Sequence, residues 1–246
     1  MATEFKLQIE CSDLQVEVLI NDLPVFIQNG GQRTKNTLIN HWLRDDHNRI
    51  EIRLNPVGEL NPNIANSYLE LTLSENDRRF YAFSWKPSEE EPLPVATRRG
   101  FNSNTNFGEW IWQNSEQLEL NEATINEINR FLQRIYESLN SANIGETLNL
   151  FRIKAEEQAI AFGIPTDERL FQQRSFFEQW FSEIGWGMEK INFDLLSYRL
   201  CADGRVVFVS YKNSSDVLQS KPVGDGEMVS FPLFISKLEG RWIIVR

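Results

Sequence analysis

Apolar and polar residues alternate with a period of two along the first third of the chain. In the segment NRIEIRL, Ile50, Ile52 and Leu54 alternate with charged residues. The same pattern recurs in EFKLQIE, LQVEVLI, LPVFI, TLINHWL, SYLELTL and RFYAFSW, and turn residues separate these segments. Such alternation predicts half-buried strands with one face in water, which pack as two antiparallel sheets. We therefore expect about seven strands and an all-β sandwich domain over residues 1–86.

The pattern changes to a helical period at Asn121. Three segments carry apolar residues every three or four positions: the first follows Asn121, the second covers about 145–162, and the third covers 166–185. Either Asn121 or Thr124 is expected to cap the first helix, and Gly163 is expected to end the second. The predicted buried side of the third helix consists of Leu170, Phe177, Phe181 and Ile184.

Strands return after the helices. Asp203 and Gly204 predict the turn of one hairpin, and Glu239 and Gly240 predict the turn of a second. The final strand, GRWIIVR, is apolar on both faces, so we expect it to be central or covered and its removal to destroy the domain. The second prediction is therefore an α+β domain over residues 115–246, in which three helices precede a curved four-stranded antiparallel sheet.

Residues 87–114 interrupt both patterns. Three prolines lie between Pro87 and Pro94, an acidic triplet spans Glu89 to Glu91, and an Asn/Ser-rich stretch follows Gly100. Proline, glycine and small polar residues are typical of connecting segments. The sequence therefore predicts a linker over 87–114 and a two-domain protein.

The charge of the chain limits its partners. Lys and Arg total 25 against 35 Asp and Glu, which gives a formal net charge of −10, and the acidity is spread over both halves. A nucleic-acid backbone or an anionic membrane would be repelled over most of such a surface, so we expect neither as a partner. The acidic balance suits solubility and would suit a basic protein partner. The N-terminus lacks a signal-peptide pattern and no apolar run is long enough to cross a bilayer, which predicts a cytosolic location.

The residues that commonly hold metals are sparse. Cys11 and Cys201 are the only cysteines, and we expect two reduced, partly buried thiols. His41 and His47 are the only histidines; they could meet at a metal with Asp45 or Asp46, but an ordinary strand and a polar turn account for them better. We expect no metal and no cofactor, since the chain also lacks a glycine-rich nucleotide loop and a G-x-S-x-G motif.

Two stretches carry family resemblances. LQRIYESLNSANIGETLNLF, from Leu132 to Phe151, is similar to the opening helices of the nuclear-transport-factor-2-like superfamily, and EGRWIIVR is similar to its final strand. This resemblance covers roughly residues 120–246 and implies an α+β cone of the ketosteroid-isomerase-like kind. The superfamily includes isomerases, cyclases, dehydratases and non-catalytic pairing modules, so the fold does not decide the function. In the first half, about 35 residues from NDLPVFIQNGG onward resemble jelly-roll accessory domains of sugar-processing enzymes.

The resemblance transfers few catalytic residues. Ile135 stands where the isomerase pattern has its oxyanion-binding tyrosine, with Tyr136 one residue later, and Asn143 stands in place of the acid after the helix break. No histidine is present in this half. The remaining cavity candidates are Asp194 as a base and Tyr198 as a hydrogen-bond donor, which lie four apart on a predicted strand and therefore on one face. In the alternative interpretation Asp194 faces water and Tyr198 packs in the core.

Aromatic residues supply the candidates for ligand binding. The candidates are Trp110, Trp112, Trp186 and Tyr211. Trp110 and Trp112 lie two apart and could form a stacking platform for a sugar or a partner. In the alternative, they anchor the linker to a core, because an indole ring is costly to leave in water.

These observations favour a non-catalytic binding or assembly module of a bacterial cytosol over an enzyme. A protein partner or a homodimer is expected, and an immunity-type or accessory role is one instance. The first alternative is an enzyme or small-ligand-binding protein that uses the cavity of the second domain. The second alternative is carbohydrate binding by the sandwich. The sequence identifies neither the partner nor the small ligand.

Overall fold

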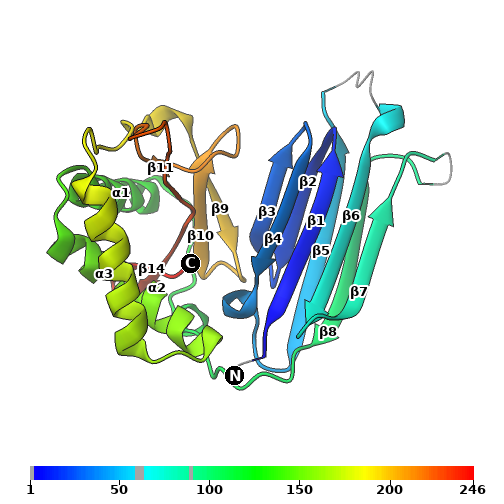
Figure 1. The fold of residues 1–246 in the computed structure, drawn as a ribbon, viewed down its shortest axis with the longest axis horizontal. Coiled ribbons are helices and arrows are strands. Elements are labelled where there is room, and N and C mark those ends of the chain that lie inside the picture. Colours follow the sequence, from blue (N-terminus) through cyan, green and yellow to red (C-terminus); the bar gives the residue numbers. More distant parts are fainter. Residues whose placement is uncertain (1–2, 59–63, 89–90) are drawn as a thin grey trace. The chain divides into compact units, whose positions relative to one another are not determined.

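The computed structural model describes residues 3–58, 64–88 and 91–246, and the chain divides into two compact units. The first unit is Met1–Gly108 and the second is Glu109–Arg246. Figure 1 shows the strands of the first unit and the helices and strands of the second. Two residues of the acidic triplet, 89 and 90, lie outside the described ranges. Within those ranges, no helix has the length and apolar composition needed to cross a bilayer.

Two four-stranded antiparallel sheets form the described part of the first unit. The strand orders are β4-β1-β6-β7 and β3-β2-β5-β8. The strands are β1 (Phe5–Ser12), β2 (Leu14–Ile20), β3 (Leu23–Asn29), β4 (Arg33–Leu38), β5 (His47–Pro56), β6 (Tyr68–Glu75), β7 (Arg78–Trp85) and β8 (Val95–Asn102). One hydrophobic core takes side chains from both sheets. The strand-rich first region predicted from the sequence is therefore present.

The alternation along β5 shows why these segments fold as strands. Ile50, Ile52 and Leu54 are each at most 1% exposed and lie in the core shared by the two sheets. Successive residues of a strand point to opposite faces, so an apolar residue at every second position covers one face completely. Full burial of each such side chain contributes about 1.5–3 kcal/mol.

Two segments of the first unit differ from the prediction. In TLINHWL, strand β4 ends at Leu38 and a short 3₁₀ helix, η1 (Asn40–Trp42), follows, so the segment is not one strand. Strand β8 lies inside the segment predicted to be a linker and pairs with β5 along its whole length. Its sequence, VATRRGFN, is mostly polar, and it joins the sheet through backbone hydrogen bonds that leave no apolar period to detect. A second 3₁₀ helix, η2 (Ile64–Asn66), precedes β6.

Three helices open the second unit as the sequence predicts. They are α1 (Glu122–Asn140), α2 (Ile144–Phe162) and α3 (Thr166–Ser182). Asn121 caps α1, because its side chain accepts a hydrogen bond from the Thr124 backbone at 3.0 Å. Gly163 ends α2 in the left-handed conformation, with a φ of +63°. One prediction is wrong: α3 ends at Ser182, and Ile184 beyond it is 95% exposed instead of buried.

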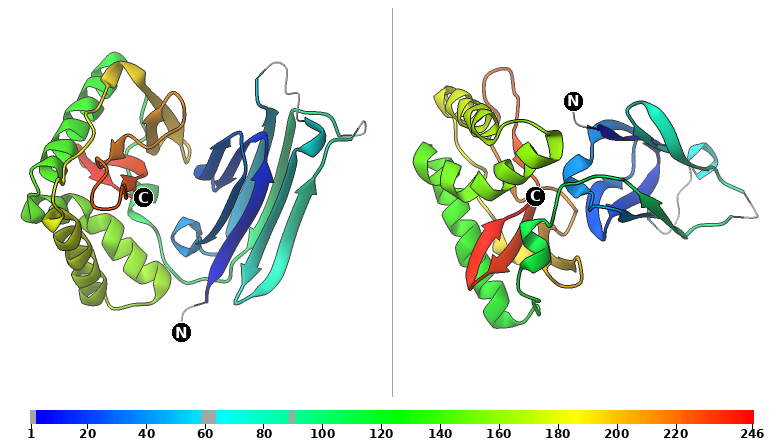
Figure 2. Two further views of the ribbon diagram at one scale, coloured as in Figure 1. Left: turned by 45° about the horizontal axis from the view of Figure 1, so that its top comes forward. Right: turned by 90° about the horizontal axis from the view of Figure 1, so that it is seen from below.

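The rest of the second unit is antiparallel sheet. Its larger sheet has the order β14-β13-β10-β9, and a two-stranded sheet of β11 and β12 lies between β10 and β13 in the chain. The elements are η4 (Phe193–Leu195), β9 (Leu196–Cys201), β10 (Val206–Tyr211), β11 (Leu218–Gln219), β12 (Ser230–Phe231), β13 (Leu233–Leu238) and β14 (Arg241–Ile244). Figures 1 and 2 show the three helices along one side of this unit. The predicted hairpins are confirmed, with Glu239 and Gly240 both at positive φ in the second turn.

The final strand is at an edge of its sheet and not at the centre. It pairs with β13 alone among the described strands, and helix α2 packs against it. Of the two expected positions, central or covered, the structure therefore shows the second. This placement leaves space between β14 and the helices, where the most extensive described pocket of the unit lies.

Candidate functional site

The two cavity candidates from the sequence do not come together on one strand. Asp194 lies in the 3₁₀ helix η4, before β9 begins, and its side chain is exposed. Tyr198 lies on β9, is half-buried, and donates its hydroxyl proton to Oδ1 of Asn129 on α1. Burial raises the pKa of Tyr198, against a smaller lowering effect of that hydrogen bond. The prediction that both residues project from the same strand face is wrong, because the chain makes a turn at Asp194.

The aromatic candidates are held inside the second unit. Trp110 and Trp112 are each 1% exposed, so neither ring offers a stacking surface. Trp112 belongs to the short helix η3 (Ile111–Asn114), and Trp110 precedes it. Trp186 and Tyr211 are half-buried: Trp186 donates its indole N–H to the Leu139 carbonyl at 2.9 Å, and the Tyr211 hydroxyl accepts from the Asn192 backbone at 3.3 Å. All four side chains therefore contribute to packing of this unit.

The histidine and cysteine residues do not form a metal centre. Nδ1 of His47 lies 2.7 Å from the Asn102 side chain, and Asp45 accepts hydrogen bonds from the backbone of Phe107 and Gly108 at 2.6 and 2.9 Å. Cys11 and Cys201 are buried and form no disulfide. Among the residues that the structure describes, no group of three or more His, Cys, Asp or Glu residues is close enough to share a metal ion.

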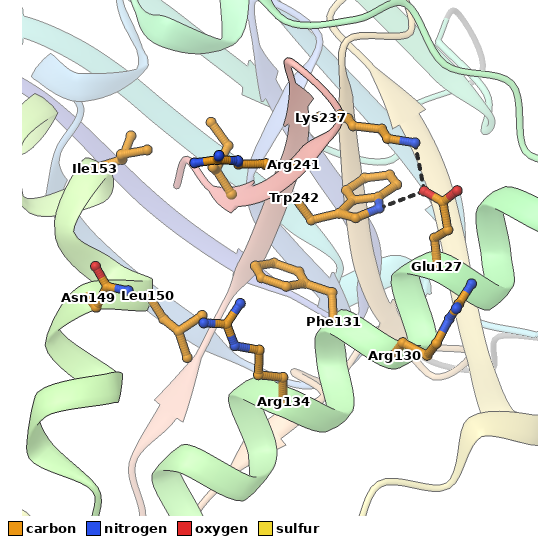
Figure 3. A pocket seen from close by; sticks show the side chains of 12 residues that line it. Glu127, Arg130, Phe131, Arg134, Asn149, Leu150, Ile153, Lys237, Arg241 and Trp242 are labelled. Carbon is orange, nitrogen blue, oxygen red and sulfur yellow. Dashed lines mark hydrogen bonds and ion pairs between the residues drawn. The ribbon is translucent and has the colours of Figure 1, made fainter.

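The candidate site is a groove bounded by α1, α2 and the β13–β14 hairpin, here called the basic groove. Its volume is about 860 Å³. It is lined by Glu127, Arg130, Phe131, Arg134, Asn149, Leu150, Ile153, Lys237, Gly240, Arg241, Trp242 and Ile243. Figure 3 shows the Phe131 and Trp242 rings between the basic side chains of α1 and those of the hairpin. Four basic residues and a single acidic residue thus surround an apolar floor.

Two of the four basic residues are neutralised by carboxylates. Nζ of Lys237 lies 2.7 Å from Oε2 of Glu127, and Arg134 pairs with Glu146 of α2. Arg130 and Arg241 are exposed and form no ion pair with any described residue. The groove therefore has an excess of positive charge in a chain whose total charge is strongly negative.

Glu127 is the one carboxylate among the residues that line the basic groove, and one of its two oxygens is already engaged. Oε2 accepts hydrogen bonds from Lys237 Nζ at 2.7 Å and from the Trp242 indole N–H at 3.0 Å. These two bonds, in that order, lower the pKa of Glu127. A general base needs a free lone pair and a pKa near the working pH. The lowered pKa of Glu127 disfavours a role as a base, and its two hydrogen bonds fix Lys237 and Trp242 in place.

Sequence reasoning missed this groove, although part of its signal was readable. Arg130 and Arg134 are four residues apart on α1 and so share a helix face. The other wall comes from Lys237, Arg241 and Trp242 on a hairpin more than 100 residues later, and only the packing of the hairpin against the helices brings them to α1. A pattern confined to one element could not show that second wall.

Comparison with known proteins found no family model, no curated protein and no solved structure that matches this chain.

Proposed function

We propose that the protein is a non-catalytic binding module whose second unit uses the basic groove to hold an acidic segment of a partner protein. The observation that carries this proposal is the composition of the groove: Arg130 and Arg241 form no ion pair with any described residue, and the carboxylate of Glu127 already accepts two hydrogen bonds. The groove can bind negative charge, and the lowered pKa of Glu127 disfavours a role for that group as a catalytic base. The binding role is the one expected from the sequence. The partner surface is different, because the acidic balance of the chain would suit a basic partner whereas the groove suits an acidic one.

Arginine and tryptophan suit a protein segment better than a free ion. The planar guanidinium binds a carboxylate through two parallel hydrogen bonds, and Arg and Trp dominate the binding energy of many interfaces. Phe131 and Trp242 offer apolar surface between Arg130 and Arg241, as Figure 3 shows. A segment with an apolar residue flanked by acidic residues would use both kinds of surface. The net charge of −10 disfavours nucleic acid as the bound polyanion.

Finer statements about fold and location belong to the same proposal. Two sheets around one core support a β-sandwich for the first unit, and three helices followed by an antiparallel sheet support a nuclear-transport-factor-2-like cone for the second. Two buried thiols that form no disulfide suit a reducing compartment such as the cytosol. Because members of such cones include enzymes and binding modules, the groove and not the fold supports the functional proposal.

The test uses a defined acidic probe. A fluorescently labelled peptide in which Glu residues flank a Leu is titrated with the protein, and binding is followed by fluorescence anisotropy. The same peptide with Gln in place of Glu should bind at least tenfold more weakly, because the guanidinium groups recognise the carboxylates. The double variant Arg130→Glu with Arg241→Glu should weaken binding of the acidic peptide by a similar factor.

A matched variant controls for total charge. Lys190→Glu with Lys221→Glu changes the net charge by the same amount at exposed positions that do not line the groove. This variant should keep the wild-type affinity at moderate salt, where distant charges are screened. Equal binding of the Glu and Gln peptides, or equal loss in both double variants, would contradict the proposal.

A further inference from the structure

A second pocket lies between α2, α3 and β12 and shares no lining residue with the basic groove. Its volume is about 220 Å³. It is lined by Phe151, Lys154, Gln158, Arg169, Gln172, Gln173, Phe176, Phe177, Ser230 and Phe231. One side is therefore cationic and amide-rich, while the other is aromatic. We call it the lysine pocket.

Neither cation of the lysine pocket forms an ion pair with any residue that the structure describes. Arg169 donates to the amide oxygen of Gln158 at 3.2 and 2.5 Å and to that of Gln172 at 3.4 Å. These neutral acceptors fix the guanidinium without cancelling its charge. Lys154 on α2 forms no hydrogen bond or ion pair with any residue in the described ranges. Two positive charges in one partly enclosed space favour an anion, because a buried charge is stable only when it is compensated.

A buried amide oxygen in the wall of the same pocket also has no partner. Gln173 is only 9% exposed, and its Nε2 donates to the Phe151 carbonyl at 3.2 Å. Its Oε1 makes no hydrogen bond within the described part of the chain. Buried polar atoms are nearly always hydrogen-bonded, so a free acceptor of this kind marks a place where a donor is expected. This observation is independent of the two cations.

The aromatic side of the lysine pocket is a cluster of phenylalanines. The Phe177 and Phe231 rings are stacked, with centroids 6.0 Å apart and an interplanar angle of 24°. Phe176 lies edge-on to Phe231 at 6.3 Å and is 39% exposed. Phe177 and Phe231 are 2% and 8% exposed, so a flat apolar group entering the pocket would contact mainly the Phe176 ring, by stacking or at its edge. Phe176 is the most exposed of the three rings.

We propose that the lysine pocket binds a small carboxylate with a flat apolar body, its carboxylate held by Lys154 and Arg169 and its body held by the phenylalanines. The volume is equal to that of about seven waters at ~30 Å³ each, which suits a molecule of the size of benzoate. Arg169 presents a planar fork that matches a carboxylate, and Lys154 adds a point charge. A donor group on the ligand would satisfy Oε1 of Gln173.

The electrostatic state of Lys154 agrees with this assignment. Burial, together with the nearby charges of Arg246 and Arg169, lowers its pKa to about 8, while Asp216 opposes the shift. A bound carboxylate would favour the charged amine and so raise the pKa again. Binding should therefore be tighter below pH 8 and weaken as the pH rises through that value, because the free protein loses the charge that attracts the ligand. Benzoate stays ionised over this range, so the dependence reports the protein.

The experiment is a calorimetric titration of the full chain with benzoate. Benzoate should bind saturably, whereas benzamide, which lacks the charge, and acetate, which lacks the ring, should bind at least tenfold more weakly. Lys154→Met keeps the length of the side chain and should weaken benzoate binding roughly tenfold or more, since it removes a charged hydrogen bond to the carboxylate. The same variant should lose the pH dependence near 8. Arg152→Gln removes one positive charge from an exposed position of α2 and should bind as the wild type does.

Several results would overturn the proposal. No saturable binding of benzoate, equal affinity for benzoate and benzamide, or unchanged affinity in Lys154→Met would each reject it. Tighter binding of phenyl phosphate than of benzoate would reject the carboxylate assignment. If Lys154→Met does not fold by circular dichroism, Arg169→Gln serves as the second variant and should also weaken binding. Because the two sites share no residue, acidic-peptide binding by the basic groove can fail while benzoate binding succeeds, and the reverse.

Discussion

Glu51 in the first unit and Glu157 in the second are both buried carboxylates paired with arginine, yet their partners differ in access to water. Glu51 accepts from Arg53 and Arg98 at 2.6 Å each, and those side chains are 37% and 63% exposed. Glu157 pairs with Arg246, whose side chain is 1% exposed. The first carboxylate is clamped by cations that reach solvent, while the second faces a cation that cannot. Although Glu51 and Glu157 are both buried, we therefore expect the loss of Glu157 to lower the unfolding free energy more than the loss of Glu51.

The ion pair of Glu157 with Arg246 also connects the end of the second unit's sheet to Trp110, which lies in the predicted linker. Arg246 lies over the Trp110 ring at 4.9 Å, and the other oxygen of Glu157 accepts from the Ile111 backbone at 2.6 Å. One side chain of α2 thus joins the segment at 110–111 to Arg246, two residues after β14 ends. The ion network around Glu51 instead runs over the outer face of β2, β5 and β8, where Glu17 also pairs with Arg53.

The largest effect is expected from Glu157→Gln. This change leaves the Arg246 charge buried without a counter-charge, and breaking a buried ion pair in this way costs about 3–5 kcal/mol of unfolding free energy. Urea unfolding of the full chain, followed by hydrogen exchange of α2 peptides, measures the loss. Removing both charges, as Glu157→Gln with Arg246→Met, should recover most of it. The control is Glu156→Gln, which removes only the solvent-exposed ion pair with Arg152 and should cost at most about 0.5 kcal/mol. A fully stable Glu157→Gln variant would show that water reaches Arg246.

A smaller loss is expected from Glu51→Gln, and this difference is the direct test of the comparison. The substitution removes charged hydrogen bonds worth about 1.5 kcal/mol, but Arg53 and Arg98 can turn their charges to water. Hydrogen exchange of β5 peptides in urea reports this unit separately from the other. If Glu51→Gln destabilises its unit as much as Glu157→Gln does, solvent access of the partner is not the deciding property.

The pH dependence of the same variant sharpens the result. Burial raises the pKa of Glu51, but hydrogen bonds from Arg98 and Arg53 outweigh burial, so the pKa falls below its ordinary value of 4.5. The folded unit then binds fewer protons than the unfolded chain, and the stabilisation is complete above pH 4.5 and is lost as the pH falls through the folded pKa. The difference in unfolding free energy between wild type and Glu51→Gln should therefore shrink below pH 4.5. A difference that grows in acid would contradict the direction of the shift.

Much of the fold could be predicted because the spacing of apolar residues differs between strands and helices and identifies most of these elements. Ile50, Ile52 and Leu54 alternate and are buried, and Asn121 and Gly163 begin and end helices where expected. Strand β8 could not be predicted, because its pairing with β5 comes from backbone groups that every residue has. Alternation in the sequence reveals a strand only when its side chains are buried on one face. In a mostly polar edge strand few side chains are buried, so the pattern is absent.

The candidate sites were harder to predict, because each one combines elements far apart in the chain. Lys154 and Arg169 read as ordinary charges on two helices, and only the packing of α2 on α3 places them in one pocket. The prediction that Asp194 and Tyr198 share a face requires an extended strand over both residues. The 3₁₀ helix η4 contains Asp194 instead, so the prediction fails. Spacing gives a shared face only after the local conformation is known.

Tyr198→Phe should have a modest effect on stability and none on binding. The change removes one hydrogen bond to Asn129 and should cost about 1 kcal/mol of unfolding free energy. Tyr136→Phe is the matched control, since the Tyr136 hydroxyl makes no hydrogen bond within the described residues, and it should cost less. The comparison is made by urea unfolding under the same conditions. If Tyr198→Phe folds normally but loses benzoate or acidic-peptide binding, Tyr198 has a functional role after all.

The smallest effect is expected from Asp194→Asn. The carboxylate is exposed, makes no hydrogen bond to another described residue, and lines neither the basic groove nor the lysine pocket. The structural hydrogen bonds of Asp194 are made by its backbone, since its N–H donates to Asn192 and its carbonyl accepts from Lys212. Both bonds remain in the variant. The unfolding midpoint and both binding affinities should therefore equal those of the wild type. Because a general base cannot be replaced by an amide without loss of activity, any function that disappears in Asp194→Asn while the fold persists would favour the enzyme hypothesis over the binding module.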